Sequence, residues 1–466
     1  MIEGLKPYAE YKESGQEWLG GVPSHWKVPR IKTVLQEKDA RTRDGSGTLL
    51  SLTRNRGLIA RSDMTEKIHG ARTLAGYKLY MPGEIVMNRM QAWSGMFGAG
   101  PIAGLVSPDY AVFKALGQEL VGFLLARIKA PDLVSQFALQ SRGIGSGFNR
   151  LYSDRLGAIT ISLPPPDEQA AIVRFLDHAN RKIDGFIRAK RKLIALLGEQ
   201  KQVIIHRAVT RGLNPNVPLK SSGISWLGEI PAHWNIRPIK QTLRRMDYGT
   251  SESALPNGKI RVLNMGHIQS GRILIPKSGG LDQMPSGLVL ERDDLLFNRT
   301  NSPELVGKVG FFEGDADSPI TFASYLVRLR ARSEHNPRWL NYVLNSVRFW
   351  SYARSQALVS LHQANLNCSR YGRMNIPVPP KKEQDAITNY ISDKGGEVDK
   401  AIARTEREIA LMQEYRTRLT ADIVTGKLDV REAAAHLPDP PNEVISESPD
   451  TELDDVDDLE AEATKD

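Results

Sequence analysis

The chain has a single cysteine, Cys368, among its 466 residues, so it cannot form an internal disulfide and fits a reducing compartment. It has no run of 18 apolar residues and no apolar leader after Met1. We therefore expect neither a membrane span nor secretion, and a cytoplasmic location. A Gly-x-x-x-x-Gly-Lys-Ser/Thr phosphate loop is also absent, which excludes a nucleotide-driven motor of that kind.

Negative charge is scarce outside the C-terminal end of the chain. The formal net charge is +8, but residues 438–466 hold twelve Asp/Glu and one Lys, which leaves residues 1–437 at +19. The acidic end has no aromatic residue and no helical periodicity, so a disordered tail is expected there. A body this basic suits a polyanion, of which nucleic acid is the commonest.

What the chain does contain is one set of motifs, present twice in the same order. Trp-Leu-Gly-x-Val/Ile-Pro-x-His-Trp occupies residues 18–26 and returns 208 residues later, at 226–234. An Asn-Arg pair follows a β-like run in each half, and Pro-Pro-x-x-Glu-Gln follows at 164–169 and 379–384. A repeat of this length indicates two whole domains rather than a solenoid. The chain is therefore interpreted as a tandem duplication.

Each half is predicted to be a mixed α+β domain. Short β-like runs separated by Gly and Asn come first, at 48–52, 84–87 and 109–113 and again at 260–263, 295–297 and 324–329. Helical stretches are expected near 120–128 and 337–353. Trp26 and Trp234 are expected to fill the two cores. His25 and His233 are not interpreted as metal ligands, because no Cys or carboxylate recurs beside them at ligand spacing.

After each Pro-Pro the apolar residues recur every three to four positions, over 172–205 and 387–423. This period predicts two helices of about 40 residues, each about 60 Å long at 1.5 Å per residue. Both are expected to begin after proline with acidic residues in the first turn and to end at a Val-Thr pair. Gly185, Gly198 and the pair Gly395-Gly396 weaken the helices. Because the apolar stripe of a helix this long must pack against another helix, the two long helices are expected to pair.

These motifs resemble those of the specificity subunit of type I restriction–modification systems, over residues 8–430. The resemblance implies two target recognition domains that each read one half of a split DNA sequence. It also implies that the two helices form an antiparallel coiled coil, act as a spacer and dock methyltransferase subunits, two in number, with restriction/translocase subunits joining through the complex. The first half departs from the frequent family form at 87–95, and the acidic tail is not part of the common pattern.

The resemblance sets the expected domain boundaries. They are a first target recognition domain at 1–165, a central spacer helix at 166–213, a second target recognition domain at 214–379, a distal spacer helix at 380–430 and an acidic disordered tail at 431–466. It also implies a protein without catalytic residues, metal or cofactor of its own. S-adenosylmethionine, Mg²⁺ and ATP are expected on partner subunits only.

The alternative is a self-contained DNA methyltransferase or nuclease, and a third interpretation is a purely structural coiled-coil scaffold. A methyltransferase of this system would carry Asn/Asp-Pro-Pro-Tyr/Phe, a string that the sequence lacks. The glycine-rich run at 143–147 has neither the Lys-Ser/Thr of a phosphate loop nor a strand–helix context, and its counterpart at 358–362 has no glycine. A flexible loop that faces DNA is the favoured interpretation of that run.

Arg and Asn side chains can pair bidentately with guanine and adenine edges, so the repeated Asn-Arg pairs are candidate DNA contacts. Because both halves share these pairs, a role in the fold or at phosphates is favoured over base reading. Residues that read sequence should differ between the copies. The full candidate set is Arg54, Asn55, Arg56, Asn88, Arg89, Gln91, Trp93 and Asn149 in the first half and Thr250, Ser251, Asn298, Arg299, Asn301, Ser302, Gln363 and Asn365 in the second.

Overall fold

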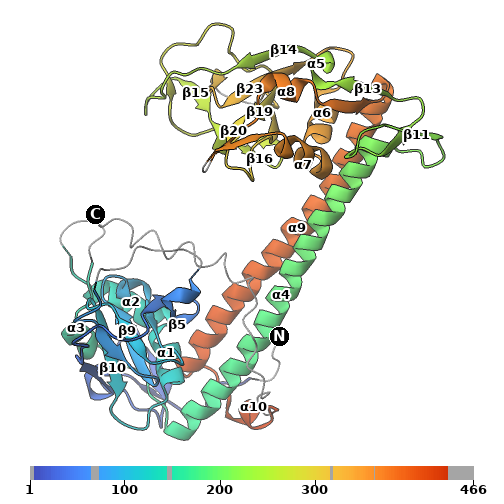
Figure 1. Cartoon of the computed structure of the whole chain (residues 1–466). Helices are drawn as coiled ribbons and strands as arrows, with labels where there is room; N and C mark the ends of the chain where they lie inside the picture. The colour runs from blue at the N-terminus through green and yellow to red at the C-terminus, as the bar shows by residue number, and fades with distance from the viewer. Residues whose placement is uncertain (1–4, 65–72, 144–148, 315–317, 361–362, 439–466) are drawn as a thin grey trace. The chain divides into compact units, whose positions relative to one another are not determined.

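The computed structural model describes residues 5–64, 73–143, 149–314, 318–360 and 363–438, and it confirms the α+β class (Figure 1). The chain forms two compact units. The first unit combines Met1–Ala189 with Glu408–Asp466, and the second holds Lys190–Arg407. None of the described helices is long and apolar enough to cross a membrane. The predicted DNA-facing loop at 144–147 and the tail from 439 onward lie outside the described residues.

The two long helices form where the sequence predicts them. Helix α4 spans Pro166–Arg211 and helix α9 spans Lys381–Val424, with 46 and 44 residues. Each begins directly after proline and carries acidic residues in its first turn, where they complement the helix dipole. The helical glycines, including Gly395-Gly396, do not interrupt either helix.

Helices α4 and α9 lie side by side and run antiparallel (Figure 1). In the first unit Arg416 forms an ion pair with Asp184, and in the second Lys201 pairs with Asp399 at 2.6 Å. A step of 17 residues forward along α4, from Asp184 to Lys201, therefore moves the partner 17 residues back along α9, from Arg416 to Asp399. Opposite numbering of this kind confirms the predicted antiparallel pairing.

A central sheet lies in each unit, with the same order of four antiparallel strands. The order β3-β10-β7-β8 in the first unit corresponds to β14-β23-β19-β21 in the second, where β17 and β16 extend the sheet. The first set is β3 (Leu35–Lys38), β10 (Tyr110–Ala115), β7 (Glu84–Asn88) and β8 (Phe97–Gly98). The second is β14 (Leu243–Tyr248), β23 (Leu326–Ala331), β19 (Leu295–Asn298), β21 (Val309–Phe311), β17 (Arg272–Ile273) and β16 (Ile268–Gln269). Duplication is therefore visible in topology as well as in sequence.

The remaining strands form small sheets and hairpins. In the first unit these are β1 (Tyr11–Glu13) with β2 (Gly21–Pro23), β4 (Leu50–Thr53) with β5 (Gly57–Ala60), and β6 (Lys78–Tyr80) with β9 (Gly104–Val106). In the second they are β11 (Leu219–Ser221) with β12 (Glu229–Pro231), β13 (Asn235–Pro238) with β26 (Asn375–Val378), β18 (Gly280–Leu281) with β15 (Ile260–Leu263) and β22 (Ile320–Phe322), and β20 (Thr300–Asn301) with β25 (Gln363–Asn365) and β24 (Leu358–Ser360).

Short helices pack on each central sheet. They are α1 (Val121–Ile128), α2 (Pro131–Gln140) and α3 (Ser153–Ala158) in the first unit, and α5 (Ile239–Thr242), α6 (Pro337–Leu344), α7 (Val347–Ser355) and α8 (Cys368–Gly372) in the second. The helical stretch predicted over 337–353 is two helices, because the chain leaves helical geometry at Asn345 and Ser346. Asn345 turns its amide to the backbone of Val309 and Asn341 instead.

Each unit has its own apolar core, closed by the end of one long helix. Trp26 and Trp234 are fully buried, as predicted. Leu419 and Ile423 near the end of α9 join the first core, and Ile205 near the end of α4 joins the second. After α9, residues Arg431–Ala435 form helix α10 and Ala434 is buried against the first core, so these first residues of the predicted disordered tail are ordered.

Candidate nucleic-acid interface

The histidine and tryptophan of the repeated motif contact the glutamate at the start of a long helix. In the first unit Glu168 accepts hydrogen bonds from Trp26 Nε1 at 3.0 Å and Tyr8 Oη at 2.5 Å, and its other oxygen lies 2.7 Å from His25 Nε2. Glu168 is 5 % exposed. Burial, followed by the hydrogen bond and charge of Glu168, raises the pKa of Tyr8, which keeps that hydroxyl protonated as the donor.

The second unit repeats these contacts. Glu383 accepts from Trp234 Nε1 at 2.9 Å and lies 2.7 Å from His233 Nε2. The next residue is also used alike, because Gln169 accepts from Leu120 N and Gln384 from Asn336 N, each at the start of a short helix. We call these paired interactions the framework contacts. They explain the His-Trp and Glu-Gln motifs as structural, and sequence reasoning missed the pairing although both motifs recur at matching places.

The exits of the long helices complete the framework. A Cβ on Gly426 would lie 2.4 Å from Pro23 and 3.2 Å from Trp26, and one on Gly212 would lie 3.1 Å from Trp234. Both glycines have left-handed φ, +83° and +72°. The helix that ends against each tryptophan therefore needs glycine for its turn and for the close approach.

In the first unit the candidate residues other than Asn149 lie on two neighbouring segments, the β4–β5 turn and the end of β7 with the loop that follows it. Arg54 and Asn55 lie exposed in the turn between β4 and β5, with Arg56 half-buried. The Arg54 guanidinium donates to the backbone oxygen of Ser94 at 2.9 Å and to its Oγ at 3.1 Å. Trp93, in the adjacent loop, is 44 % exposed. The hydrogen bonds from Arg54 thus hold the two loops together.

Burial separates the two Asn residues of the Asn-Arg pairs from the exposed candidates. Asn88 is 7 % exposed, donates to Gln91 Oε1 at 2.8 Å and accepts from Met90 N at 3.0 Å, so it shapes the turn after β7. Asn298 is 1 % exposed. Burial of this degree favours a role in the fold for both, since neither amide is presented at the surface.

The two Arg residues of these pairs have different surroundings. Arg89 Nη2 donates to Glu37 Oε1 at 2.6 Å. Arg299 instead lies over the ring of Tyr248, 5.2 Å from its centroid, and donates to Ser324 O at 3.5 Å. The backbone around them is nevertheless conserved between the copies, because Leu151 N donates to Arg89 O and Leu366 N donates to Arg299 O. Exposed Asn149, two residues before Leu151, therefore lies on the segment that passes Arg89.

In the second unit the candidates gather around β20 and β25. Thr300 pairs with Asn365 and Asn301 pairs with Ala364 across these strands, and Asn365 Nδ2 donates to Thr300 Oγ1 at 3.0 Å. Gln363 is exposed, while Asn301 and Ser302 are half-buried. Thr250 is buried in a bridge to Ala323, and exposed Ser251 follows it. Six of the eight second-half candidates are thus exposed or half-buried, whereas Thr250 and Asn298 are buried.

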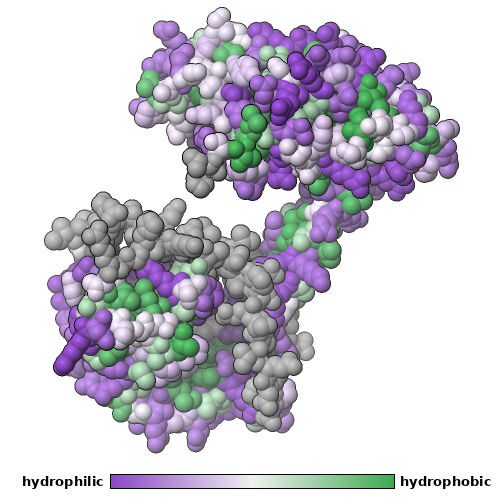
Figure 2. Space-filling view, viewed as in Figure 1, coloured by the Kyte–Doolittle hydropathy of each residue, from purple (hydrophilic) through white to green (hydrophobic). Residues whose placement is uncertain are grey.

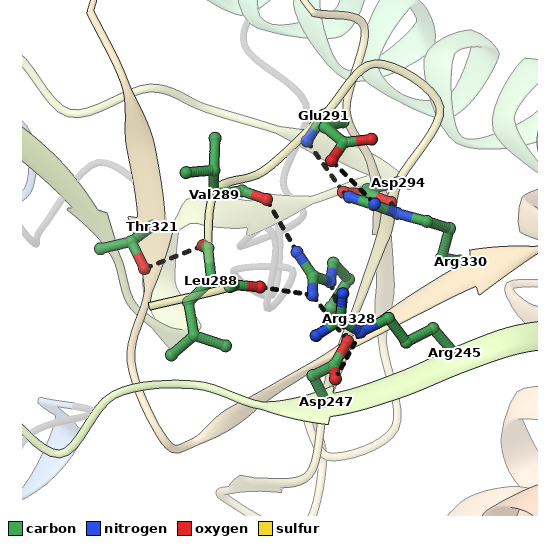
Figure 3. Close-up of polar contacts among 10 residues, drawn as sticks. Arg245, Asp247, Leu288, Val289, Glu291, Asp294, Thr321, Arg328 and Arg330 are labelled. Carbon is green, nitrogen blue, oxygen red and sulfur yellow. Dashed lines mark hydrogen bonds and ion pairs between the residues drawn. The ribbon is translucent and has the colours of Figure 1, made fainter. Parts of the chain in front are cut away.

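A buried charge network supports the sheet of the second unit (Figure 3). Arg328, 1 % exposed, donates to Asp247 Oδ2 at 2.7 Å and to the backbone oxygens of Val289 and Gly287. Burial acts to raise the pKa of Asp247, but hydrogen bonds from Arg328 and Arg245 outweigh it and hold that pKa below its usual value. Arg330 donates to both oxygens of Asp294, and these hydrogen bonds raise the pKa of Arg330.

The turn before the central strand shows the duplication at the level of single atoms. Glu84 accepts from the backbone nitrogen of Met81 at 2.8 Å, and Asp294 accepts from that of Glu291 at 2.8 Å. The preceding residues, Gly83 and Asp293, both have left-handed φ, +90° and +70°. Fold, framework contacts and turns together define a class of protein: two copies of one α+β framework joined by an antiparallel helix pair, with loops that differ between the copies.

Comparison with known proteins identifies the particular members of this class that the chain resembles. It is 24 % identical over 304 residues to the type I restriction enzyme MjaVIII specificity subunit of Methanocaldococcus jannaschii, which covers 63 % of this chain and 68 % of the relative. It is 21 % identical over 360 residues to the EcoKI specificity subunit of Escherichia coli K12, covering 70 % and 72 %. The curated relatives are thus specificity subunits of type I restriction enzymes, as the motifs predict.

A third relative is matched over less of its length. It is provisionally named the type I restriction enzyme MjaX specificity subunit of M. jannaschii, and 204 residues align at 23 % identity, covering 43 % of this chain and 47 % of that protein. No protein-family model matches the chain. A solved structure concerned with complex assembly and conformational transition of the type I R-M system superimposes with a TM-score of 0.61 at 14 % identity, covering 87 % of this chain and 99 % of that chain. That likeness bears on the fold alone.

Proposed function

We propose that this chain is the DNA-specificity subunit of a type I restriction–modification complex and carries no catalytic site of its own. Each unit reads one half of a split DNA sequence. One observation carries the proposal: the framework contacts are the same in both units, whereas the exposed loops beside the Asn-Arg pairs differ. Two copies of one framework with different loops suit the recognition of two different half-sites.

Charge supports DNA as the ligand. Residues 190–407 hold 32 Lys/Arg and 19 Asp/Glu, a net charge of +13. The first unit without residues 438–466 holds 29 and 23, a net charge of +6. Affinity for phosphates therefore comes from both units, with the larger share from the second.

The remaining roles belong to partners. The antiparallel pair of α4 and α9 is the spacer, and we assign it the docking of two methyltransferase subunits, through which restriction/translocase subunits join. S-adenosylmethionine, Mg²⁺ and ATP would bind to those subunits, in the cytoplasm where the DNA is. The self-contained methyltransferase or nuclease is disfavoured, because the relatives are named as specificity subunits.

The test compares the purified chain with its complex. DNA, Mg²⁺ and S-adenosylmethionine are incubated with the chain alone and with co-expressed methyltransferase subunits, and the methylated bases are sequenced. We expect no methyl transfer by the chain alone, and transfer by the complex at two short specific sequences around a spacer of fixed length. Turnover by the chain alone would establish the alternative, and a continuous methylated motif would contradict the two-unit reading.

A further inference from the structure

We propose that the paired strands β24 and β25 are a base-contacting element of the second unit and that the apolar strand β24 packs against thymine methyl groups in the major groove. This inference rests on the proposed function and names a specificity element within it. Leu358 and Val359 are not among the candidate DNA contacts chosen from the sequence.

The exposure of β24 is the first observation. Leu358 is 69 % exposed and Val359 is 62 % exposed, and Ser360 is exposed as well. Successive side chains of a strand point to opposite faces, so neither face of β24 is covered. It is also the edge of the sheet β20-β25-β24. Proteins avoid exposed apolar edge strands because these associate with other molecules, so a partner is expected to cover this one.

The surroundings favour DNA as that partner. The same small sheet carries the amides of Asn301, Gln363 and Asn365, which suit base edges. Arg370 lies near the start of β24, where its Nη1 donates to Gln356 O at 2.9 Å. The visible face of the second unit is mainly hydrophilic, with small apolar patches between (Figure 2). A two-stranded ribbon fits the major groove, where thymine presents its methyl group.

The equivalent place in the first unit provides the second observation. The hydrogen bonds Leu151 N to Arg89 O and Leu366 N to Arg299 O align the segments that contain Arg150 and Asn365. In the first unit Arg142 pairs with Arg150 where Leu358 pairs with Asn365 in the second. Identical methyltransferase copies would require the same surface twice, but the first unit has Arg142 and Arg150 where the second has Leu358 and Asn365. Two units that read different half-sites need different side chains at equivalent places of the shared framework.

The experiment uses the complex with its methyltransferase subunits and measures binding to a duplex that contains the methylated sequence. We expect the double variant Leu358→Ser/Val359→Ser to lose roughly 10- to 100-fold in affinity for this duplex and less than about 3-fold for an unrelated duplex. The salt dependence of binding should keep its slope, because apolar contacts release no counterions. Arg142→Gln, at the equivalent place in the first unit, should instead lower the slope by about one.

Replacement of thymine by deoxyuridine removes only the methyl group. In the half-site read by the second unit it should weaken binding of the unsubstituted protein by roughly 3- to 10-fold per contacted base and leave binding by the double variant unchanged. Leu274→Ser, an exposed apolar residue of the same unit at 45 % exposure, is the matched control and should bind like the original.

Three outcomes would overturn the inference. The double variant could bind the specific duplex with unchanged affinity, it could fail to assemble with the methyltransferase, or it could convert a self-associating chain into a monomer. The second and third results would assign β24 to a protein partner or to a second copy. Failure of the proposed function is distinguishable, since the original complex would then show no preference between the two duplexes. Unchanged thermal unfolding of the double variant confirms that exposed β24 does not support the fold.

Discussion

At the residue scale, the carboxylate at the start of each long helix holds the buried tryptophan in place. Replacing Glu168 with Gln gives Trp26 Nε1 and Tyr8 Oη an amide that can accept through only one oxygen and that brings donors of its own. We expect Glu168→Gln to lower the free energy of unfolding by about 2–4 kcal/mol. Glu383→Gln should cost about 1 kcal/mol, because Glu383 is 40 % exposed and water can replace the lost contact.

The measurement is denaturant unfolding followed by tryptophan fluorescence. Asp167→Asn is the matched control, since Asp167 is an exposed carboxylate one residue away in the same first helical turn. It should change the free energy of unfolding by no more than about 0.5 kcal/mol. Equal effects of the Glu168 and Asp167 variants would mean that the helix dipole, and not the framework contacts, accounts for the loss.

A second prediction concerns the paired left-handed residues. Asp293 has φ +70°, and its counterpart Gly83 has φ +90°. A positive φ is sterically unfavourable for a residue with a Cβ but not for glycine. We expect Asp293→Gly to raise the free energy of unfolding by about 0.5–1 kcal/mol and Gly83→Asp to lower it by about 1 kcal/mol or more. A Cβ on Gly83 would meet no atom within 4 Å, so backbone strain alone is tested. Opposite signs in thermal or denaturant unfolding would confirm this, and equal signs would refute it.

Residue-level prediction from sequence succeeded where the signal was local. The prolines and the acidic residues of the first helical turn predicted where α4 and α9 begin, and the repeated tryptophans were correctly predicted as core. Contacts between distant residues could not be predicted in this way. Glu168 reaches His25 across 143 positions and Glu383 reaches His233 across 150, and nothing in either segment alone specifies the other. The exposure of Leu358 and Val359 could not be predicted either, because the sequence of an apolar strand does not specify whether another element packs over it.

At the scale of elements, ion pairs connect β23 to β14 and to the turn before β19 in the central sheet of the second unit. Because the pKa of Asp247 is held below its unfolded value, its ionised form stabilises the fold. This contribution is fully present above the unfolded pKa of about 3.9 and is lost as the pH falls through the lower folded value. We expect Asp247→Asn to destabilise the fold at pH 7 by about 3 kcal/mol, since buried Arg328 loses its counterion.

The pH series separates this contribution from general acid unfolding. Unfolding free energies measured between pH 7 and pH 3 should fall less steeply below pH 4 for Asp247→Asn than for the original chain. Asp282→Asn, at an exposed carboxylate in the same unit, serves as the control and should keep the original pH dependence. Parallel curves for the two Asp247 forms would show that this carboxylate does not contribute to acid sensitivity.

The helix pair makes a prediction about spacing at the same scale. Four residues inserted beside Leu196 and four beside Leu411 lie between the two ion pairs on both helices, so Asp184–Arg416 and Lys201–Asp399 can each persist. The insertion lengthens the pair by about 6 Å, close to two base pairs of B-DNA. We expect the methylated sequence to keep its specific bases and to gain spacer length. New bases with an unchanged spacer would mean that the helices do not set the distance.

At the scale of the whole molecule, the framework contacts predict that the two segments proposed to read DNA can be exchanged. A chimera in which a second copy of 222–379 replaces 14–164 brings His-Trp from the second half against Glu168 and Gly426. In the second unit His233 and Trp234 already contact residues of the same types, Glu383 and Gly212. The inserted segment also supplies a backbone N–H for Gln169 in place of that of Leu120, because Asn336 N already donates to the matching Gln384 in the second unit. We therefore expect the chimera to fold.

The expected function of the chimera follows from the antiparallel helices. Identical segments on an antiparallel pair are related by a near two-fold axis, so the chimera should direct methylation to an inverted, symmetrical site built from the second half-sequence. The methylome of cells that carry the chimera with its methyltransferase is the measurement. A chimera of 222–379 that carries Leu358→Ser/Val359→Ser in both copies should lose this activity more strongly than one altered copy does, since both half-sites then depend on β24. A folded chimera that still methylates the original asymmetric site would show that the exchanged segments do not read sequence.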